Sequence, residues 1–298
     1  MKMIENCRLC PRKCGVNRDN GELGFCGVGS EMIISRYSLH MGEEPCISGN
    51  GGSGTIFFSH CNMKCVFCQN YEISIDNKGR IVSVEEFCDI CMKLQDRGAS
   101  NINLVTGCMY IPLIVEGLKL AKSKGLDIPI VYNSSGYESV GALRLLDGLV
   151  DIYLPDFKYY DDNLAWRYSK AKDYYKYTSL AIEEMYRQVG KFEFDKDGMM
   201  LNGVIIRHLV MPSCCSDSMK IIKCLYDKYK DNIYFSIMNQ YTPIRKIGVD
   251  SLERLVTDDE YDKVIDYAYD LGIRNAFIQE CNTQSKDFIP DFDQFDGV

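Results

Sequence analysis

Short β-rich runs alternate with helical patterns from Thr55 onward, and this alternation limits the fold more than any other feature. Strands separated by helices are typical of βα units, which build parallel sheets. About six or seven such units predict an α/β fold with a full or partial (β/α) barrel of about six parallel strands. Active sites of such barrels lie at the carboxyl ends of the strands. The expected strands are 55–58, 101–105, 128–132, 150–154, 204–210, 233–237 and 275–278.

The amino-terminal part of the chain differs from the rest. Cys, Gly and Arg are dense there, and apolar periodicity is weak until Met32-Ile33-Ile34. We therefore expect two units: a cysteine-rich metal-binding module at 1–53 and the barrel at 54–298. At the other end, we expect the acidic segment 287–296 to be a surface strap or a frayed end.

Composition and charge narrow the classes of function. The 298 residues carry a formal net charge of -8, which argues against a broad nucleic-acid interface because that would need a basic face. No apolar run is long enough to span a membrane, and the first residues lack the apolar core of a signal peptide. We therefore expect a cytoplasmic protein that binds neither membranes nor nucleic acid. In a reducing compartment the fifteen cysteines are expected to be metal ligands or core residues rather than disulfides.

Three cysteines form the most specific motif. Cys61, Cys65 and Cys68 directly follow the first expected strand, with Phe67 before the last of them. Three thiolates on one tight loop can hold three irons of a cubane cluster and leave the fourth iron open, whereas electron-transfer clusters are usually closed by four cysteines. Buried or zinc-bound cysteines are the alternative interpretation.

This loop resembles the signature of the radical S-adenosylmethionine (SAM) superfamily. The resemblance implies a [4Fe-4S] cluster on Cys61, Cys65 and Cys68, with SAM chelating the open iron and yielding a 5′-deoxyadenosyl radical that abstracts hydrogen. The chain looks closest to the pyruvate formate-lyase activating enzyme group, which implies an oxidoreductase that activates a glycyl-radical protein. A glycyl-radical protein or another protein substrate is the implied partner. A low-potential donor such as flavodoxin or ferredoxin would supply electrons.

The resemblance also implies SAM contacts at the following strand ends. Relatives place Gly-Gly-Glu after the second strand, but this chain has Thr106-Gly107-Cys108, for which we expect only a backbone role. Further expected contacts with SAM or substrate are Asn133, Ser134, Ser135, Asp156, Lys158 and Arg207. A polar turn at 133–136 and a solvated surface pair of Asp156 and Lys158 are the alternatives.

A second set of cysteines lies in the expected module. Cys7, Cys10, Cys14 and Cys26 suit either tetrahedral zinc or a closed iron–sulfur cluster, and their spacing does not separate the two. Cys46 is an alternative ligand, although an isolated cysteine is more often a core residue. Cys88 and Cys91 fall on the apolar stripe of an expected helix and are therefore expected to pack in the core.

The alternative function is an iron–sulfur electron carrier or a zinc-stabilised binding protein without SAM chemistry. A carrier would close the cluster of the 61–68 loop with a fourth thiolate. The candidates for that ligand are Cys108 and Cys281.

Overall fold

A run of parallel strands forms the centre of the sheet in the computed structural model, which describes residues 2–279, 284 and 290–297. Neighbours in this run pair in the order β2, β4, β5, β6, β8, β9, β10. Each strand overlaps an expected one, so the predicted α/β fold is confirmed. The bounds are Ser53–Phe58, Ile102–Val105, Ile130–Ser134, Ile152–Pro155, Met200–Leu209, Tyr234–Met238 and Ala276–Ile278.

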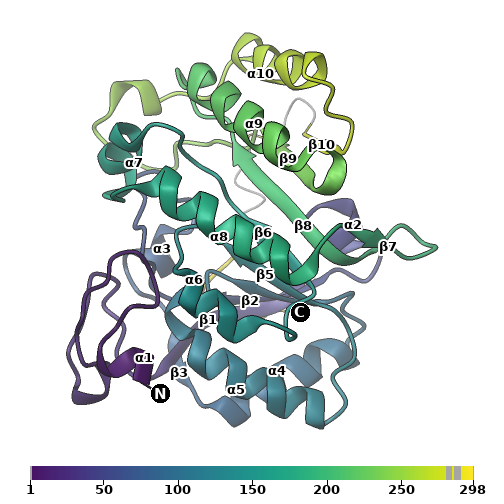
Figure 1. Ribbon diagram of the computed structural model, residues 1–298. Helices are drawn as coiled ribbons and strands as arrows, with labels where there is room; N and C mark the ends of the chain where they lie inside the picture. The colour runs from purple at the N-terminus through teal and green to yellow at the C-terminus, as the bar shows by residue number, and fades with distance from the viewer. Residues whose placement is uncertain (1, 280–283, 285–289, 298) are drawn as a thin grey trace.

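The barrel is partial, because β10 pairs with β9 alone among the described strands. The longer helices follow one another along one face of the sheet (Figure 1). They are α4 (Val84–Asp96), α5 (Ile111–Ser123), α8 (Tyr174–Val189), α9 (Cys215–Tyr229) and α10 (Asp258–Asp270). Shorter helices are α1 (Lys2–Glu5), α2 (Pro45–Ser48), α3 (Tyr71–Ser74), α6 (Val140–Leu143) and α7 (Asp162–Ser169). In the described part of the chain, no helix has the length and apolarity needed to cross a bilayer.

Local sequence explains these elements. Every residue of β2, β4, β5 and β6 is buried, as is typical of parallel strands covered on both faces. Helix α4 begins with a capping box in which Ser83 accepts from the backbone N–H of Glu86 and the Glu86 carboxylate accepts from that of Ser83. Cys88 and Cys91 are fully buried on its apolar face, which confirms that they pack in the core.

Several strands of the sheet, all outside the parallel run, were not expected from the sequence. Strand β1 (Met32–His40) pairs antiparallel with β2, with Tyr37 opposite Ile56. The short strand β3 (Arg80–Val82) pairs with β1, and β7 (Glu193–Phe194) pairs with β8. Residues on both sides of the expected boundary at residue 53 therefore share one sheet and one hydrophobic core.

The carboxyl-terminal residues 290–297 form a strap across β1. Strand β11 (Asp296–Gly297) pairs parallel with β1, and the Asp296 carboxylate forms ion pairs with Arg97, at 2.7 Å, and with Lys93. The Phe292 ring packs edge-on against Phe57, with 5.6 Å between centroids. The expected strap is confirmed for these residues, and 287–289 lie outside the described part of the chain.

A buried carboxyl group behind β5 makes stability depend on pH. Glu138 is 1% exposed, and its Oε2 accepts a 3.0 Å hydrogen bond from the Tyr132 hydroxyl. Burial raises the pKa of Glu138 to about 7, although hydrogen bonds from Tyr132 and Ser134 act in the opposite direction. Its protonated form is thus favoured by folding, and this stabilisation is lost as pH rises from the ordinary glutamate range through about 7.

We therefore expect Glu138→Gln to flatten the pH dependence of unfolding. The variant should match the wild type near pH 5 and exceed its free energy of unfolding by about 2 kcal/mol above pH 8, because the amide carries no charge to desolvate. Urea titrations of both proteins under reducing conditions, from pH 5 to 9, measure the difference. Parallel curves for the two proteins would contradict the assignment.

Candidate active site

The 61–68 loop lies in the wall of a cavity of about 580 Å³ at the carboxyl ends of the parallel strands. Cys61 and Cys65 are buried and Cys68 is half-buried, and all three line this cavity, which we call the cluster cavity. His60 and Lys64 have φ angles of +69° and +51°, so the backbone turns sharply around the cysteines. The loop is thus directed into the cavity by the strand that precedes it.

Donors surround the three sulfur atoms. The Ser169 hydroxyl donates to Cys65 Sγ at 2.9 Å, the Ser74 hydroxyl to Cys68 Sγ at 3.2 Å, and the Met63 backbone N–H to Cys61 Sγ at 3.3 Å. Burial raises the pKa of the Cys61 thiol to about 12, so ligation has to displace its proton. Donors of this kind stabilise a thiolate charge and tune a bound cluster. Neither serine was expected at the site from the sequence.

The six residues expected at strand ends all line the same cavity as the three cysteines. The Asn133 amide and the Ser135 hydroxyl have no hydrogen-bond partner among residues 2–279, 284 and 290–297, whereas Ser134 Oγ accepts from the Gly136 backbone N–H at 3.1 Å. Ser134 therefore supports the turn, and its two neighbours leave polar atoms for a bound molecule. Thr106 also lines the cavity, with φ at +62°. Contacts of Asn133, Ser134 and Ser135 with a bound ligand remain predictions.

Asp156 and Lys158 form an ion pair inside the cavity wall. Their side chains are only 22% and 17% exposed, so this is not a solvated surface pair. Burial disfavours the ammonium, but the nearby Asp156 and Cys65 raise the pKa of Lys158 above its usual value. The cavity therefore presents one fixed cation and one fixed anion within reach of Cys65, which suits a zwitterionic group such as an amino acid.

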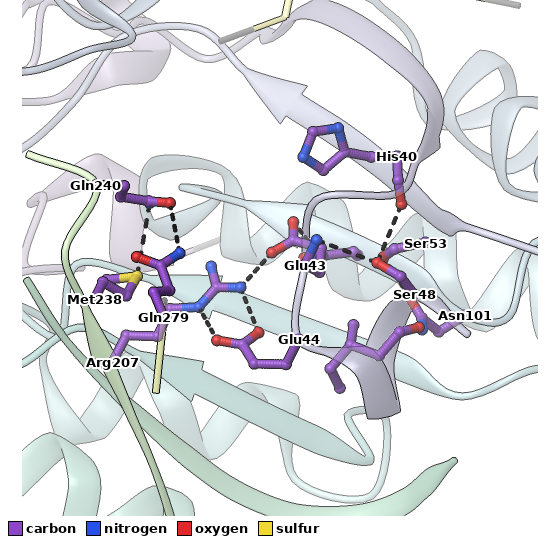
Figure 2. A network of polar contacts seen from close by, with 12 residues as sticks. His40, Glu43, Glu44, Ser48, Ser53, Asn101, Arg207, Met238, Gln240 and Gln279 are labelled. Carbon is purple, nitrogen blue, oxygen red and sulfur yellow. Dashed lines mark hydrogen bonds and ion pairs between the residues drawn. The ribbon is translucent and has the colours of Figure 1, made fainter. Parts of the chain in front are cut away.

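Arg207 is held by two carboxylates from the amino-terminal part of the chain. Its Nε donates to Glu44 Oε1 at 2.8 Å, and its Nη2 contacts Glu44 Oε2 at 2.6 Å and also Glu43 Oε2 (Figure 2). The Asn103 amide donates to the other oxygen of Glu43. Burial disfavours the Glu44 carboxylate, but Arg207 holds its pKa below the usual range. Neither glutamate was expected from the sequence as a partner of Arg207, although two adjacent acids before Pro45 indicate a need for a cation.

The ion pairs leave part of Arg207 free for the predicted role. Within the described part of the chain, the side-chain hydrogen bonds of Arg207 use Nε and Nη2 and none uses Nη1, and the residue lines the cluster cavity. Arg207 can thus still meet a carboxylate of SAM or substrate. The neighbouring His208 is buried and its Nδ1 bonds to the Phe157 carbonyl at 2.7 Å, which is a structural role.

The other cysteines considered as ligands do not line the cluster cavity in the described part of the chain. Cys7, Cys10, Cys14 and Cys26 line a second, small cavity, which we call the amino-terminal cavity. Cys46 instead packs with Ile47 and Val131 in the core, and so does not join them. Cys108 is buried, with Asn62 and the Leu9 carbonyl near its sulfur, and does not line the cluster cavity. Cys281 lies outside the described residues.

Comparison with known proteins agrees with this geometry. The model of the radical SAM superfamily matches residues 55–201. An uncharacterised protein of Methanocaldococcus jannaschii is 35% identical over 280 residues, which cover 89% of this chain and 75% of that protein.

Similar solved structures share the fold at low sequence identity. They include a radical SAM methyltransferase from Sphaerobacter thermophilus (14% identity, TM-score 0.52, 76% of this chain and 66% of that one). Streptococcus suis SuiB bound to S-adenosylmethionine has 13% identity and a TM-score of 0.51, over 75% of this chain and 49% of SuiB. SuiB bound to its precursor peptide SuiA has 14% identity and a TM-score of 0.51, over 75% of this chain and 47% of that one. This chain thus spans about half to two thirds of those structures' length. The superfamily match, the M. jannaschii relative and the cysteine loop at the end of the first parallel strand together show that the chain belongs to the radical SAM superfamily.

Proposed function

We propose that this protein cleaves SAM reductively at a [4Fe-4S] cluster bound by Cys61, Cys65 and Cys68. The observation that carries the proposal is that, among the described residues, these three cysteines and no fourth line the cluster cavity, opposite free polar atoms at the strand ends. When bound, the cluster supplies an electron and an open iron for SAM, and the cleavage yields a 5′-deoxyadenosyl radical that abstracts hydrogen.

The residues of the chain bind and orient in this scheme. Asp156 and Lys158 pair with the amine and carboxylate of the methionyl group, and Asn133 and Ser135 offer hydrogen bonds to SAM. The Arg207 Nη1 meets a carboxylate of SAM or substrate. The surrounding buried strands exclude water from a reactive intermediate.

A loss of affinity for SAM tests the role of Asn133. Asn133→Ala should weaken SAM binding about 3- to 10-fold, because one or two hydrogen bonds are lost without disturbing an internal partner. Anaerobic equilibrium dialysis of the reconstituted protein measures this. The matched control is Asn163→Ala, since the exposed Asn163 amide bonds only to Asp161 at the start of α7. Equal affinities for the two variants would remove Asn133 from the site.

The proposed reaction is tested by anaerobic reconstitution with iron and sulfide, followed by reduction and addition of SAM. We expect 5′-deoxyadenosine to accumulate and the electron paramagnetic resonance of the reduced cluster to change when SAM binds. A spectrum that SAM does not alter, together with no 5′-deoxyadenosine, would instead establish the electron carrier or the structural-metal protein.

For the substrate, we propose a segment of another protein, as in activation of a glycyl-radical protein. The open sheet supports this proposal, because the cluster cavity is lined at β10 by Ile278 and near the other end of the sheet by Phe57 and Pro290. SuiB, which has the same fold, binds a precursor peptide. Electrons would come from a flavodoxin or ferredoxin.

Isotope transfer distinguishes the substrate classes. Extract from cells grown on glycine deuterated at Cα is divided into a protein fraction and a small-molecule fraction, and each is incubated with enzyme and SAM. Deuterium in 5′-deoxyadenosine from the protein fraction is the expected result. Transfer from the small-molecule fraction alone would contradict a protein substrate.

A further inference from the structure

The amino-terminal cavity brings four cysteines together without any element of the barrel sheet. Tight turns hold them: the Cys7 backbone N–H donates to the Val16 carbonyl at 2.9 Å, and the Lys13 N–H to the Cys10 carbonyl at 3.1 Å. A Cβ on Gly24 would lie 2.9 Å from Cys14 Sγ, so only glycine lets the chain pass this sulfur. The Phe25 backbone N–H donates to the same sulfur at 3.4 Å. The loop is thus built around its sulfur atoms.

The charged side chains that line this cavity are all cations. Arg12, Lys13 and Arg18 line it, and no Asp or Glu of the described residues does. Arg18 is almost fully buried and donates to the carbonyls of Gly29 and Met109 at 2.7 and 2.8 Å. Burying Arg18 beside four thiols and two further cations is costly unless an anion accompanies it, and a metal centre with four thiolate ligands is such an anion.

Asn62 joins the amino-terminal cavity to the 61–68 loop. It lines the cavity and is the residue directly after Cys61. The side-chain Nδ2 of Asn62 donates to the Tyr137 carbonyl at 2.7 Å, and the backbone carbonyl of Asn62 accepts from Arg12 Nε at 2.9 Å. The buried side-chain oxygen Oδ1 has no hydrogen-bond partner within the described part of the chain. A single residue therefore separates the four-cysteine cavity from a ligand of the catalytic cluster.

The position of the four cysteines favours an iron–sulfur cluster over zinc. Zinc has no redox chemistry, so a zinc site here would only hold the loop together. The four thiols lie next to the 61–68 loop, because Asn62 lines their cavity and directly follows Cys61. A centre that can change its oxidation state could serve the catalytic cluster from this position, and four thiolates are the usual ligands of a closed iron–sulfur cluster.

We propose that Cys7, Cys10, Cys14 and Cys26 bind a second iron–sulfur cluster, closed by four thiolates, which passes electrons to the catalytic cluster. A reduced flavodoxin or ferredoxin gives one electron to this cluster and is oxidised. The cluster returns to its oxidised state when the electron moves past Asn62 to the cluster on Cys61, where SAM cleavage consumes it. The electron-passing role rests on the proposed function, whereas the binding of the second cluster does not.

Two cysteine variants test separately whether the second cluster binds and whether it passes electrons. In Cys61→Ala/Cys65→Ala/Cys68→Ala, iron and sulfide should remain bound after anaerobic reconstitution, with a paramagnetic resonance signal that SAM does not change. If this variant binds no iron, or binds zinc in its place, the second cluster is refuted. Wild type that fails to cleave SAM while this variant keeps its cluster would refute the proposed function alone.

Cys10→Ala/Cys14→Ala tests the transfer of electrons. Dithionite is small and reduces the catalytic cluster directly, so it should still drive SAM cleavage, whereas cleavage driven by reduced flavodoxin should be lost. Equal loss with both reductants would indicate a structural role and overturn the relay. The double variant Cys88→Ala/Cys91→Ala, in the core side of α4, is the control and should respond alike to both reductants.

Discussion

Replacing Cys65 by alanine is expected to lower the rate of SAM cleavage about a thousandfold or more, equivalent to at least about 4 kcal/mol of transition-state stabilisation. Cys65 is buried and lines the cluster cavity, and the Ser169 hydroxyl donates to its sulfur. With two thiolates left on the loop, a cubane loses an iron or opens a second position, and SAM is no longer fixed at one site. Chromatographic measurement of 5′-deoxyadenosine gives the rate.

The matched control for this prediction is Cys91→Ala. Cys91 is fully buried on the apolar face of α4, so its loss should cost about 1 kcal/mol of stability and leave SAM cleavage unchanged. Cleavage that survives in Cys65→Ala would contradict the ligand assignment. Cleavage lost in both variants would indicate a general effect of cysteine replacement on folding.

The second large effect is expected at Arg207. Arg207→Met should destabilise the protein by about 3 to 5 kcal/mol, because Glu43 and Glu44 would remain buried without their cation. The triple variant Glu43→Gln/Glu44→Gln/Arg207→Met removes all three charges and should recover most of this loss. Urea unfolding under reducing conditions at pH 8 measures both values. A loss below about 1 kcal/mol in the single variant would class the network with ordinary surface ion pairs.

The Arg207 effect should also depend on pH in a defined direction. In the wild type, Arg207 holds the pKa of Glu44 below its usual value, so the ion pair contributes stability above that value and loses it as pH falls. In Arg207→Met the buried Glu44 carboxyl group has lost this cation, so its burial favours the protonated form instead. The difference between the two proteins should therefore narrow as pH is lowered from 8 to 5, and a constant difference would contradict this account.

Local patterns were sufficient for the parallel strands and for the cluster loop. Four of the parallel strands, β2, β4, β5 and β6, are continuous buried runs, and the three cysteines follow the first of them. The resemblance to the radical SAM superfamily pointed to Asn133, Asp156 and Arg207, and because parallel strands end at one edge, these residues were expected around a common cavity.

The sequence has no comparable local pattern that predicts contacts between distant segments. Strand β1 was missed because it takes its place from antiparallel pairing with β2 and not from a clear alternation of its own. Glu43 and Glu44 lie more than 160 positions before Arg207. The sequence therefore showed that burying the Arg207 charge would cost free energy without a partner, but not which residues are the partners. Ser169 was missed for a different reason, since one serine in a helical segment has no pattern that points to a sulfur atom.

The engagement of Arg207 by Glu43 and Glu44 constrains how this protein can diverge. Charge at position 207 can change only together with charge at 43 and 44, so these sites should drift as a linked group and not independently. A chimera that joins the first 53 residues of one relative to the barrel of another inherits two halves of one ion-pair network and one strand pair, β1 with β2. Recombination at that boundary is therefore tolerated only between parents whose halves match in both respects.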